Sequence, residues 1–346
     1  MSDLPADLDK SHWRPSADLA VIRLRADLLS RTRQFFFERQ VMEVETPILS
    51  HAGNPDIYIE SFRSEYEGPG GHQGLYLQTS PEFAMKRLLA AGSGPVFQIC
   101  KAFRNEELGR IHNPEFTMLE WYRPGFDHHQ LMAELQELII HLGVLEQGQT
   151  IQKLSYQQLF QTYAGLDPHK VGGEACLACI REHDIQLNDV KSYANPENLG
   201  YNEKLGYNRD ALLAVILTHV IEPELAKRGF VFVYDYPQSQ ASLARIRSGE
   251  TPVAERFELY GNGLELANGF NELTDKTEQL ERFCQDQALR QSDNKQEVDI
   301  DQLLIEALDH GLPDCAGVAV GFDRLLMLAA GKNTLDEVLA FPFGKA

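Results

Sequence analysis

The sequence has few basic residues relative to its acidic ones, and it has no long hydrophobic run. Among 346 residues, 32 Lys and Arg stand against 51 Asp and Glu, which gives a formal net charge of −19. No short window is rich in Lys and Arg, so extended binding to a nucleic-acid backbone is not expected, although a small anionic ligand could still be held by two or three arginines. No apolar run reaches the roughly 18 residues that a membrane-spanning helix needs. The N-terminus lacks the basic and apolar segments of a secretory signal. These absences favour a cytoplasmic globular protein with no membrane association.

Cysteine is also scarce. The five cysteines are an odd number and are scattered, which is typical of a reduced, cytoplasmic protein. Cys176 and Cys179 form a C-x-x-C motif, but no second Cys or His pair follows at the spacing of a zinc site. Because the flanking sequence is helix-like, we expect both thiols to pack on a helix face. A redox or metal site is the alternative.

The apolar periodicity predicts an α+β fold. Helices are expected at 17–40, 79–92, 129–143, 154–163, 210–227, 274–291, 299–309 and 322–330. Strands are expected at 41–49, 75–78, 95–123 (a long hairpin), 230–234, 256–272 and 316–321. Many of these strand signals are antiparallel, which argues against an alternating βαβ sheet. We expect a loose N-terminal arm over 1–17 and one large domain over 18–346, with a mid-chain insertion at about 145–255.

The hairpin at 95–123 places polar side chains on one face. Side chains alternate along a strand, so Phe116, Glu120 and Tyr122 share a face of the second strand. An aromatic ring, a carboxylate and a phenol in one row indicate a polar pocket.

The loop that joins the two strands is long and charged. Arg104, Arg110 and His112 are suited to holding phosphate oxygens, because a guanidinium can bind them through two donors. An ordinary solvated surface hairpin is the alternative.

A second constellation lies near residue 270. Asn268, Phe270 and Glu272 fall on one strand face and could hold an amino acid, with the amide on its carboxylate, the ring on its aliphatic stem and Glu272 on an ammonium. An exposed edge strand is the alternative.

Glu265 is out of phase with that row. It lies on the other face unless a β-bulge intervenes, for which Gly261 or Gly263 would be the candidate position.

The third constellation is the segment G-V-A-V-G-F-D-R at 317–324. It combines small residues with an arginine at a helix start. By itself this pattern is weak evidence for a binding site.

Taken together, these segments resemble the class II aminoacyl-tRNA synthetases. Motifs 1, 2 and 3 of that family are matched in order by V-E-T-P at 44–47, by F-R-N-E-E at 103–107 with H-N-P-E-F-T-M-L-E-W-Y at 112–122, and by 317–324. The segments 79–89 and 254–275 resemble the lysyl enzymes in particular. The resemblance runs from about residue 18 to the C-terminus. It implies the class II catalytic fold, an antiparallel β-sheet flanked by helices.

A lysyl-tRNA synthetase carries an anticodon-binding domain before its catalytic domain, whereas only about 17 residues precede the first helix here. The chain therefore resembles the elongation factor P–(R)-β-lysine ligase family, a paralogue of the lysyl enzymes without that domain. The resemblance implies that ATP activates (R)-β-lysine or lysine as an adenylate, which then passes to a lysine ε-amino group of elongation factor P. It implies no contact with a tRNA anticodon. The alternatives are a free-standing enzyme that charges tRNA and a non-catalytic paralogue.

The resemblance also implies the ATP-binding residues. They are Arg104, Glu106, Arg110, His112, Asn113, Phe116, Glu258, Glu265, Gly321 and Arg324. Arg104 and Arg324 would be the catalytic pair, with Arg104 on the α-phosphate and substrate carboxylate. Phe116 and Arg324 would enclose the adenine, and Glu106 would read its amino group. The two later glutamates, Glu258 and Glu265, would hold Mg²⁺, which prefers oxygen ligands.

The amino-acid site implied by the family consists of Ser80, Glu82, Glu120, Tyr122, Asn268, Phe270, Glu272 and Ala319. Glu272, Glu120 and Tyr122 would hold the ε-ammonium, and Glu82 with Ser80 the other ammonium. Ser80 and Ala319 stand where lysyl-tRNA synthetases have Ala and Gly. We hypothesise that this added hydroxyl and methyl select an amino group at the β rather than the α position. Motif 1 further implies a homodimer through about residues 20–50.

Overall fold

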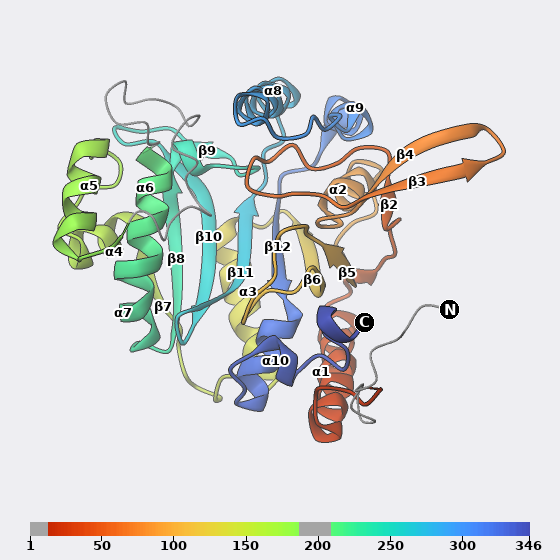
Figure 1. Ribbon diagram of the computed structural model, residues 1–346, viewed down its shortest axis with the longest axis horizontal. Helices are drawn as coiled ribbons and strands as arrows, with labels where there is room; N and C mark the ends of the chain where they lie inside the picture. The colour runs from red at the N-terminus through yellow and green to blue at the C-terminus, as the bar shows by residue number, and fades with distance from the viewer. Residues whose placement is uncertain (1–12, 187–208) are drawn as a thin grey trace, which may run out of the picture.

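The computed structural model describes residues 13–186 and 209–346. Within these residues, nine strands form a central sheet in the order β1-β5-β6-β12-β11-β10-β8-β7, with β9 paired to β10 (Figure 1). They are β1 (Met42–Glu43), β5 (Val96–Phe103), β6 (Glu115–Pro124), β7 (Gln152–Ser155), β8 (Phe230–Pro237), β9 (Ile246–Arg247), β10 (Val253–Gly261), β11 (Leu264–Asn271) and β12 (Cys315–Gly321). Only the β1–β5 and β7–β8 pairs among these are parallel. The predicted α+β class with a mainly antiparallel sheet is confirmed.

A second, three-stranded sheet extends from the body of the molecule (Figure 1). It consists of β2 (Leu49–Ser50), β3 (Arg63–Gly68) and β4 (Gly71–Leu77). The prediction of one strand over 41–49 is wrong, because its two ends join different sheets. Pro47 lies in the break, where it cannot donate to a sheet ladder. The strand expected at 75–78 begins earlier, and its partner β3 was not predicted because every side chain of β3 is exposed.

The helices agree with the sequence pattern to within a few residues at each end. They are α1 (Leu19–Glu38), α2 (Glu82–Ala90), α3 (His128–His141), α4 (Tyr156–Tyr163), α5 (Gly173–Glu182), α6 (Arg209–Ile216), α7 (Glu222–Ala226), α8 (Lys276–Ser292), α9 (Gln302–Gly311) and α10 (Phe322–Ala330). α5 was expected only as a helix-like segment. The single helix expected at 210–227 is divided by a π-helical turn, η2 (Leu217–Ile221). Short 3₁₀ turns are η3 (Gln238–Gln240), η4 (Leu335–Glu337) and η5 (Phe343–Lys345).

Three apolar cores place the helices around the sheet. α1, α3 and α10 enclose the largest core with one face of the central sheet, whose buried side chains include Phe97, Trp121 and Val318. α4 to α7 cover the sheet at β7 and β8, and α2, α8 and α9 form the third core (Figure 1). The opposite face of β6, β12, β11 and β10 carries the candidate site described below.

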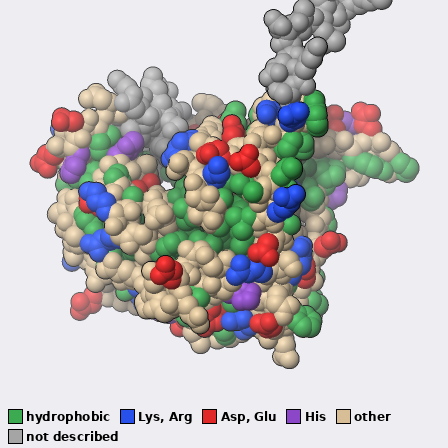
Figure 2. Space-filling view, turned by 90° about the horizontal axis from the view of Figure 1, so that it is seen from below, with side chains coloured by type: hydrophobic (Ala, Val, Ile, Leu, Met, Phe, Trp, Pro, Cys, Tyr) green, Lys and Arg blue, Asp and Glu red, His purple; other side chains and the backbone are tan. Residues whose placement is uncertain are grey.

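Several smaller predictions concern the ends and the cysteines. Of the expected arm, residues 1–12 lie outside the described part, while the N–H groups of Ser16 and Ala17 donate to the carbonyls of Ala340 and Leu339. Cys176 and Cys179 are buried in α5, so the prediction of a packed helix face is confirmed. No helix in the described ranges is long and apolar enough to cross a membrane. On the face shown in Figure 2, basic side chains lie among acidic ones rather than in a stripe.

Candidate active site

The predicted site residues come together on one face of the central sheet. Glu120 of β6 pairs with Ala319 of β12, Ala319 with Asn268 of β11, and Asn268 with Glu258 of β10. Directly opposed residues project from the same face of a sheet, so this row crosses four neighbouring strands. Segments that lie far apart in the sequence thereby supply one continuous polar surface.

The adjacent row of the sheet depends on a glycine. Gly317 lies between Tyr122 and Phe270 in the register. A Cβ at Gly317 would be 2.3 Å from Tyr122 Cε1 and 2.5 Å from Glu272 Oε1. Glycine is therefore required here for the phenol and the carboxylate to lie over the sheet.

Glu265 reaches the same face through a β-bulge. Between Leu259 and Tyr260 of β10 the register with β11 shifts by one residue, which sets Tyr260 opposite Glu265 and turns Glu265 toward the row of Glu258. The bulge that the sequence required is confirmed. Its expected position at Gly261 or Gly263 is wrong, because the residue left without a partner in the register is Leu266 of β11, which follows both glycines.

Three carboxylates, Glu82, Glu120 and Glu272, gather at one side of this face. The two oxygens of Glu120 accept hydrogen bonds from Ser80 Oγ at 2.9 Å and from the Tyr122 hydroxyl at 2.6 Å. Glu120 is only 2% exposed. Burial, together with the neighbouring Glu82 carboxylate, raises the pKa of Glu120 to about 8. No Lys, Arg or His within 13–186 and 209–346 forms an ion pair with it.

A lysine that the sequence reasoning left unassigned lies in the same pocket. Lys86 Nζ is 2.7 Å from Glu82 Oε1 and 2.6 Å from Glu272 Oε2, and the residue is 2% exposed. Burial raises the pKa of Glu272 to about 7, although Lys86 acts to lower it. The one sequence signal was the i,i+4 spacing of Glu82 and Lys86 on a helix. That spacing is ordinary on exposed helices and does not predict burial.

Asn268 and Glu258 share a second cation that sequence reasoning missed. The Arg256 guanidinium donates to Asn268 Oδ1 at 3.2 Å and to Glu258 Oε1 at 2.5 Å. The Tyr260 hydroxyl donates to the other oxygen of Glu258 at 2.7 Å. Because the amide oxygen of Asn268 is engaged, its NH₂ group is the part that could donate to a substrate carboxylate. Arg256 lies two residues before Glu258 on β10, within the segment 254–275, but sequence reasoning gave it no role.

The nucleotide side of the face begins at Arg104. Its guanidinium carbon lies 5.2 Å from the centre of the Phe116 ring, and its Nη1 is 3.7 Å from Glu107 Oε1. Arg104 Nε is buried and has no hydrogen-bond partner among the described residues. Glu106 follows in the left-handed backbone region at φ 68° and is exposed. This part of the site therefore holds an arginine donor beside an aromatic ring, a combination suited to a nucleotide phosphate and base.

Arg324 lies at the start of α10 and joins the motif 2 loop to β11. It donates to His112 Nε2 at 2.8 Å, to the carbonyl of Glu265 at 2.9 Å and to the carbonyl of Ile111 at 3.3 Å. Burial, and then the Arg324 charge, lowers the pKa of His112, which keeps the imidazole neutral and able to accept this hydrogen bond. Gly321 precedes the helix as its N-cap.

Two predicted ATP residues make other contacts. Arg110 donates to the carbonyl of Asn333 at 2.7 Å. The Asn113 amide donates to the carbonyl of Glu115 at 2.6 Å and accepts from the N–H of Phe343 at 3.0 Å. Both side chains thus tie the motif 2 loop to the C-terminal segment, and their roles toward ATP stay predictions.

A third carboxylate accompanies the predicted metal ligands. Burial raises the pKa of Glu222 to about 7, and the carboxylates of Glu265 and Glu258 add to the rise. Burial and Glu258 also raise the pKa of Glu265. Glu222 directly follows the π-helical turn, a feature frequent at functional sites, and sequence reasoning missed it. Crowded carboxylates of this kind suit Mg²⁺, which takes oxygen ligands and would relieve their mutual repulsion.

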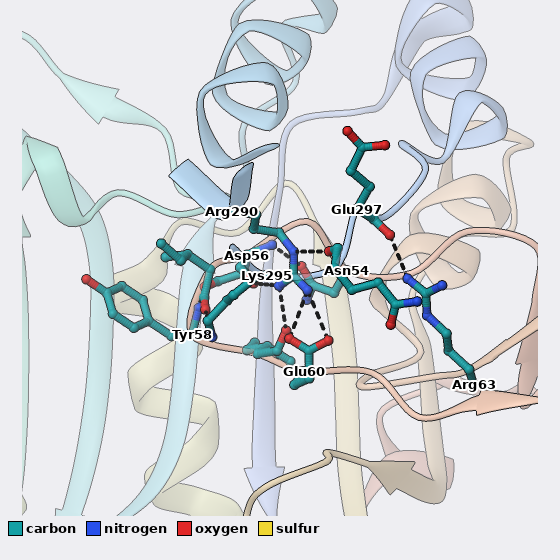
Figure 3. A network of polar contacts seen from close by, with 11 residues as sticks. Asn54, Asp56, Tyr58, Glu60, Arg63, Arg290, Lys295 and Glu297 are labelled. Atoms are coloured by element: carbon teal, nitrogen blue, oxygen red, sulfur yellow. Dashed lines mark hydrogen bonds and ion pairs between the residues drawn. The ribbon is translucent and has the colours of Figure 1, made fainter. Parts of the chain in front are cut away.

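A buried ion pair supports the motif 2 loop from the side of α8. The Arg290 guanidinium donates to both oxygens of Glu60, at 2.8 and 3.1 Å, and to the carbonyls of Asp56, Ile59 and Gln296 (Figure 3). The carbonyl of Glu60 accepts from the N–H of Asn105, the residue before Glu106. This network, which we call the Arg290 clamp, connects the end of α8 to the base of the motif 2 loop.

The comparisons with known proteins agree with this geometry. A model of the class II tRNA synthetases (D, K and N) matches residues 10–345. The chain belongs to this family. The chain is similar to the elongation factor P–(R)-β-lysine ligase of Pseudoalteromonas translucida. The two are 49% identical over 96% of this chain and 98% of that protein. Proteins of the same name from Vibrio atlanticus (48% identical, 97% of this chain and 99% of that protein) and Vibrio cholerae (47%, 98% and 100%) are also similar.

Proposed function

We propose that the chain is a cytoplasmic ligase that uses ATP to activate (R)-β-lysine, or lysine, and transfers it to a lysine ε-amino group of elongation factor P. The observation that carries the proposal is the buried acidic pocket of Glu82, Glu120 and Glu272 beside the arginine-lined nucleotide side of the same sheet face. Near-full-length similarity to proteins that bear this ligase name supports the choice of substrate and partner.

In the first step the substrate carboxylate attacks the α-phosphorus of ATP, and the bond to pyrophosphate breaks. The protein contributes mainly by positioning the reactants and stabilising charge. Arg104 would stabilise the charge at the α-phosphate, the Asn268 NH₂ group would orient the carboxylate, and Glu120 with Glu272 would hold the distal ammonium. Mg²⁺, held by Glu258 and Glu265, would neutralise phosphate oxygens when bound.

In the second step the target amine attacks the carbonyl carbon of the adenylate. An amide bond forms, the bond to AMP breaks, and the amine loses a proton to solvent or to a group that we do not assign. Enclosure of the adenylate between the nucleotide side and the acidic pocket would favour transfer over hydrolysis.

A second candidate is charging of tRNA, because the family model describes tRNA synthetases. The test follows ATP–pyrophosphate exchange that depends on lysine or (R)-β-lysine. Labelled amino acid is then offered to elongation factor P and to tRNA in parallel. We expect transfer to elongation factor P, and transfer to tRNA alone would favour the second candidate.

We also infer a homodimer through about residues 20–50. Apolar side chains in this region are exposed on α1, on β1, and at or just before the start of β2; they include Phe37, Met42, Ile48 and Leu49. An exposed apolar patch of this kind is typical of an interface. Gel filtration at micromolar concentration should give about twice the 39.1 kDa chain mass, and a monomer mass would refute the dimer.

A further inference from the structure

The acidic pocket contains a cation of its own. Lys86 projects from α2 into the space between Glu82, on the same helix, and Glu272, at the end of β11. Lys86 and Glu272 are 2% and 1% exposed. Burial by itself would lower the pKa of the Lys86 ammonium, but the two carboxylates outweigh that effect and hold the pKa above its usual value. Lys86 is therefore charged throughout the neutral range, and both of its partners are acids assigned to substrate ammonium groups.

The placement divides the three carboxylates into two kinds. Glu82 and Glu272 each have the Lys86 ammonium within 2.7 Å, whereas the hydrogen bonds of Glu120 come from the neutral hydroxyls of Ser80 and Tyr122. With all three acids ionised, one ammonium leaves two negative charges in the pocket. A diamino acid brings two ammonium groups and places its carboxylate outside this cluster, so the remaining charge matches such a ligand.

Other groups around the pocket do not change this charge near neutral pH. Besides the three acids, the titratable or charged ones are Cys100, Tyr122, Arg245, Asp314 and Cys315. Burial raises the pKa of both thiols to about 12, and burial with the nearby carboxylates raises the pKa of Tyr122 well above its usual value. Asp314 and Arg245 form an ion pair with each other at 2.5 Å. From α9, the apolar side chains of Leu304, Ile305 and Leu308 share the core with α2.

We propose that Lys86 is a positioning and specificity residue, whose ammonium fixes Glu82 and Glu272 as oriented carboxylates and thereby sets the pocket to accept a ligand with two ammonium groups. The proposal rests on the proposed function. Lys86 acts through the two glutamates. Without its charge, Glu82 and Glu272 would lose the cation that orients them, and the pKa of Glu272, which Lys86 lowers, would rise. At neutral pH Glu272 would then bind a proton in place of a substrate ammonium.

The experiment compares Lys86→Met, Lys86→Arg and the control Lys276→Met in amino-acid-dependent ATP–pyrophosphate exchange between pH 6 and 9. Lys276 is a half-exposed lysine whose ion pair with Asp309 at 3.1 Å lies outside the site. Near pH 7, Lys86→Met should raise the KM for the diamino acid about 10-fold or more, with the KM for ATP unchanged. The pH at which kcat/KM of this variant reaches half of its maximum should rise by about one unit, because an adjacent cation shifts a carboxyl pKa by this much. Lys86→Arg and Lys276→Met should keep the wild-type midpoint.

An equal loss of activity at every pH, without a shifted midpoint, would overturn the proposal, since a purely structural lysine would act in that way. If Lys86→Met does not fold, Lys86→Arg carries the test alone, and a folded arginine variant with an altered midpoint contradicts the proposal. Comparing Glu272→Gln with the Lys86→Met/Glu272→Gln double variant adds a coupling measurement. The double variant should lose less than the sum of the two single losses. Failure of the proposed function is distinguishable, because the wild-type chain would then show no exchange with either amino acid.

Discussion

Two buried ion networks in this molecule differ in their balance of charge. In the Arg290 clamp, one guanidinium that is 1% exposed meets one carboxylate and three backbone carbonyls. The acidic pocket holds three carboxylates and a single ammonium, which pairs with two of them, while the third accepts hydrogen bonds from neutral hydroxyls. Both are removed from water, where an unpaired charge is costly. The clamp is complete in the protein alone, whereas the pocket becomes balanced only when cations enter it.

This difference separates structural from functional burial of charge. The clamp joins the end of α8 to the chain before β3, and its loss should be felt in stability. The pocket holds more carboxylates than cations. Burial raises the pKa values of two of them, Glu120 and Glu272, to about 8 and 7. Perturbed carboxyl groups of this kind concentrate at sites where ligands bind.

The largest expected effect comes from removing a pocket carboxylate. Glu272→Gln should reduce lysine-dependent pyrophosphate exchange about 100-fold or more, because a buried ammonium then lacks its charged partner. The KM for ATP should change little. Glu134→Gln is the control, since Glu134 is also buried but bonds Trp121 Nε1 on the other face of the sheet. Exchange that survives Glu272→Gln intact would show that this carboxylate does not bind the amino acid.

Breaking the clamp should lower the stability of the protein and leave amino-acid binding unchanged. Arg290→Met leaves the partly exposed Glu60 without its cation and should lower the free energy of unfolding by about 3 kcal/mol, as measured by urea denaturation. The KM of the folded protein for the amino acid should stay the same. Arg228→Met, at an exposed arginine that donates to the Tyr163 hydroxyl, should cost about 1 kcal/mol or less. A raised amino-acid KM with unchanged stability would contradict the division between the two networks.

The substitution at Ala319 should alter selectivity more than rate. Ala319 lies directly between Glu120 and Asn268 in the sheet register, so its methyl group adjoins both predicted contacts to the substrate. Ala319→Gly should move the ratio of kcat/KM values from (R)-β-lysine toward lysine by about 10-fold, the typical effect of one methyl group in a pocket. Ala316→Gly, on the opposite face of β12, should leave the ratio unchanged. An unaltered ratio in Ala319→Gly would refute the role of this methyl group.

The smallest expected effect is the release of a proton when the amino acid binds. Because the pKa of Glu120 is about 8, much of this carboxyl group is protonated in the empty pocket at pH 7.5. A bound ammonium favours the carboxylate, so binding should release up to one proton at pH 7.5 and less at pH 8.5, where more of Glu120 is already ionised. Calorimetry in two buffers of different ionisation enthalpy measures this release. Proton uptake at pH 7.5 would contradict the assignment of Glu120.

The sequence predicted the elements that carry strong periodicity and the residues that belong to motifs. The β5–β6 hairpin and α10 are examples, and alternation on β6 correctly put Phe116, Glu120 and Tyr122 on one face. The burial of Lys86 was not predicted, because it results from the packing of α2 against β11 and β12, which no local sequence pattern encodes.

The position of the β-bulge and the contacts of the motif 2 loop have similar physical causes. The β-bulge was expected because Glu265 is out of phase with Asn268, but its position at Leu266 depends on the pairing between β10 and β11 and not on the glycines. The roles of Arg110 and Asn113 toward ATP stay predictions, but the contacts of their side chains with backbone near residues 333 and 343 could not be predicted. Contacts between a loop and a distant terminus are set by tertiary structure alone.

The most direct measurement compares the binding of (R)-β-lysine with that of 3-aminohexanoic acid, which keeps the chain and the β-amino group but lacks the terminal ammonium. Isothermal titration at pH 8 with the full chain and a non-hydrolysable ATP analogue gives both dissociation constants. The pocket of Glu82, Glu120, Glu272 and Lys86 predicts that the monoamine binds about 100-fold or more weakly, because one buried carboxylate stays unpaired. Equal affinity for the two compounds would contradict the claim that the surplus acid of the pocket receives a second ammonium.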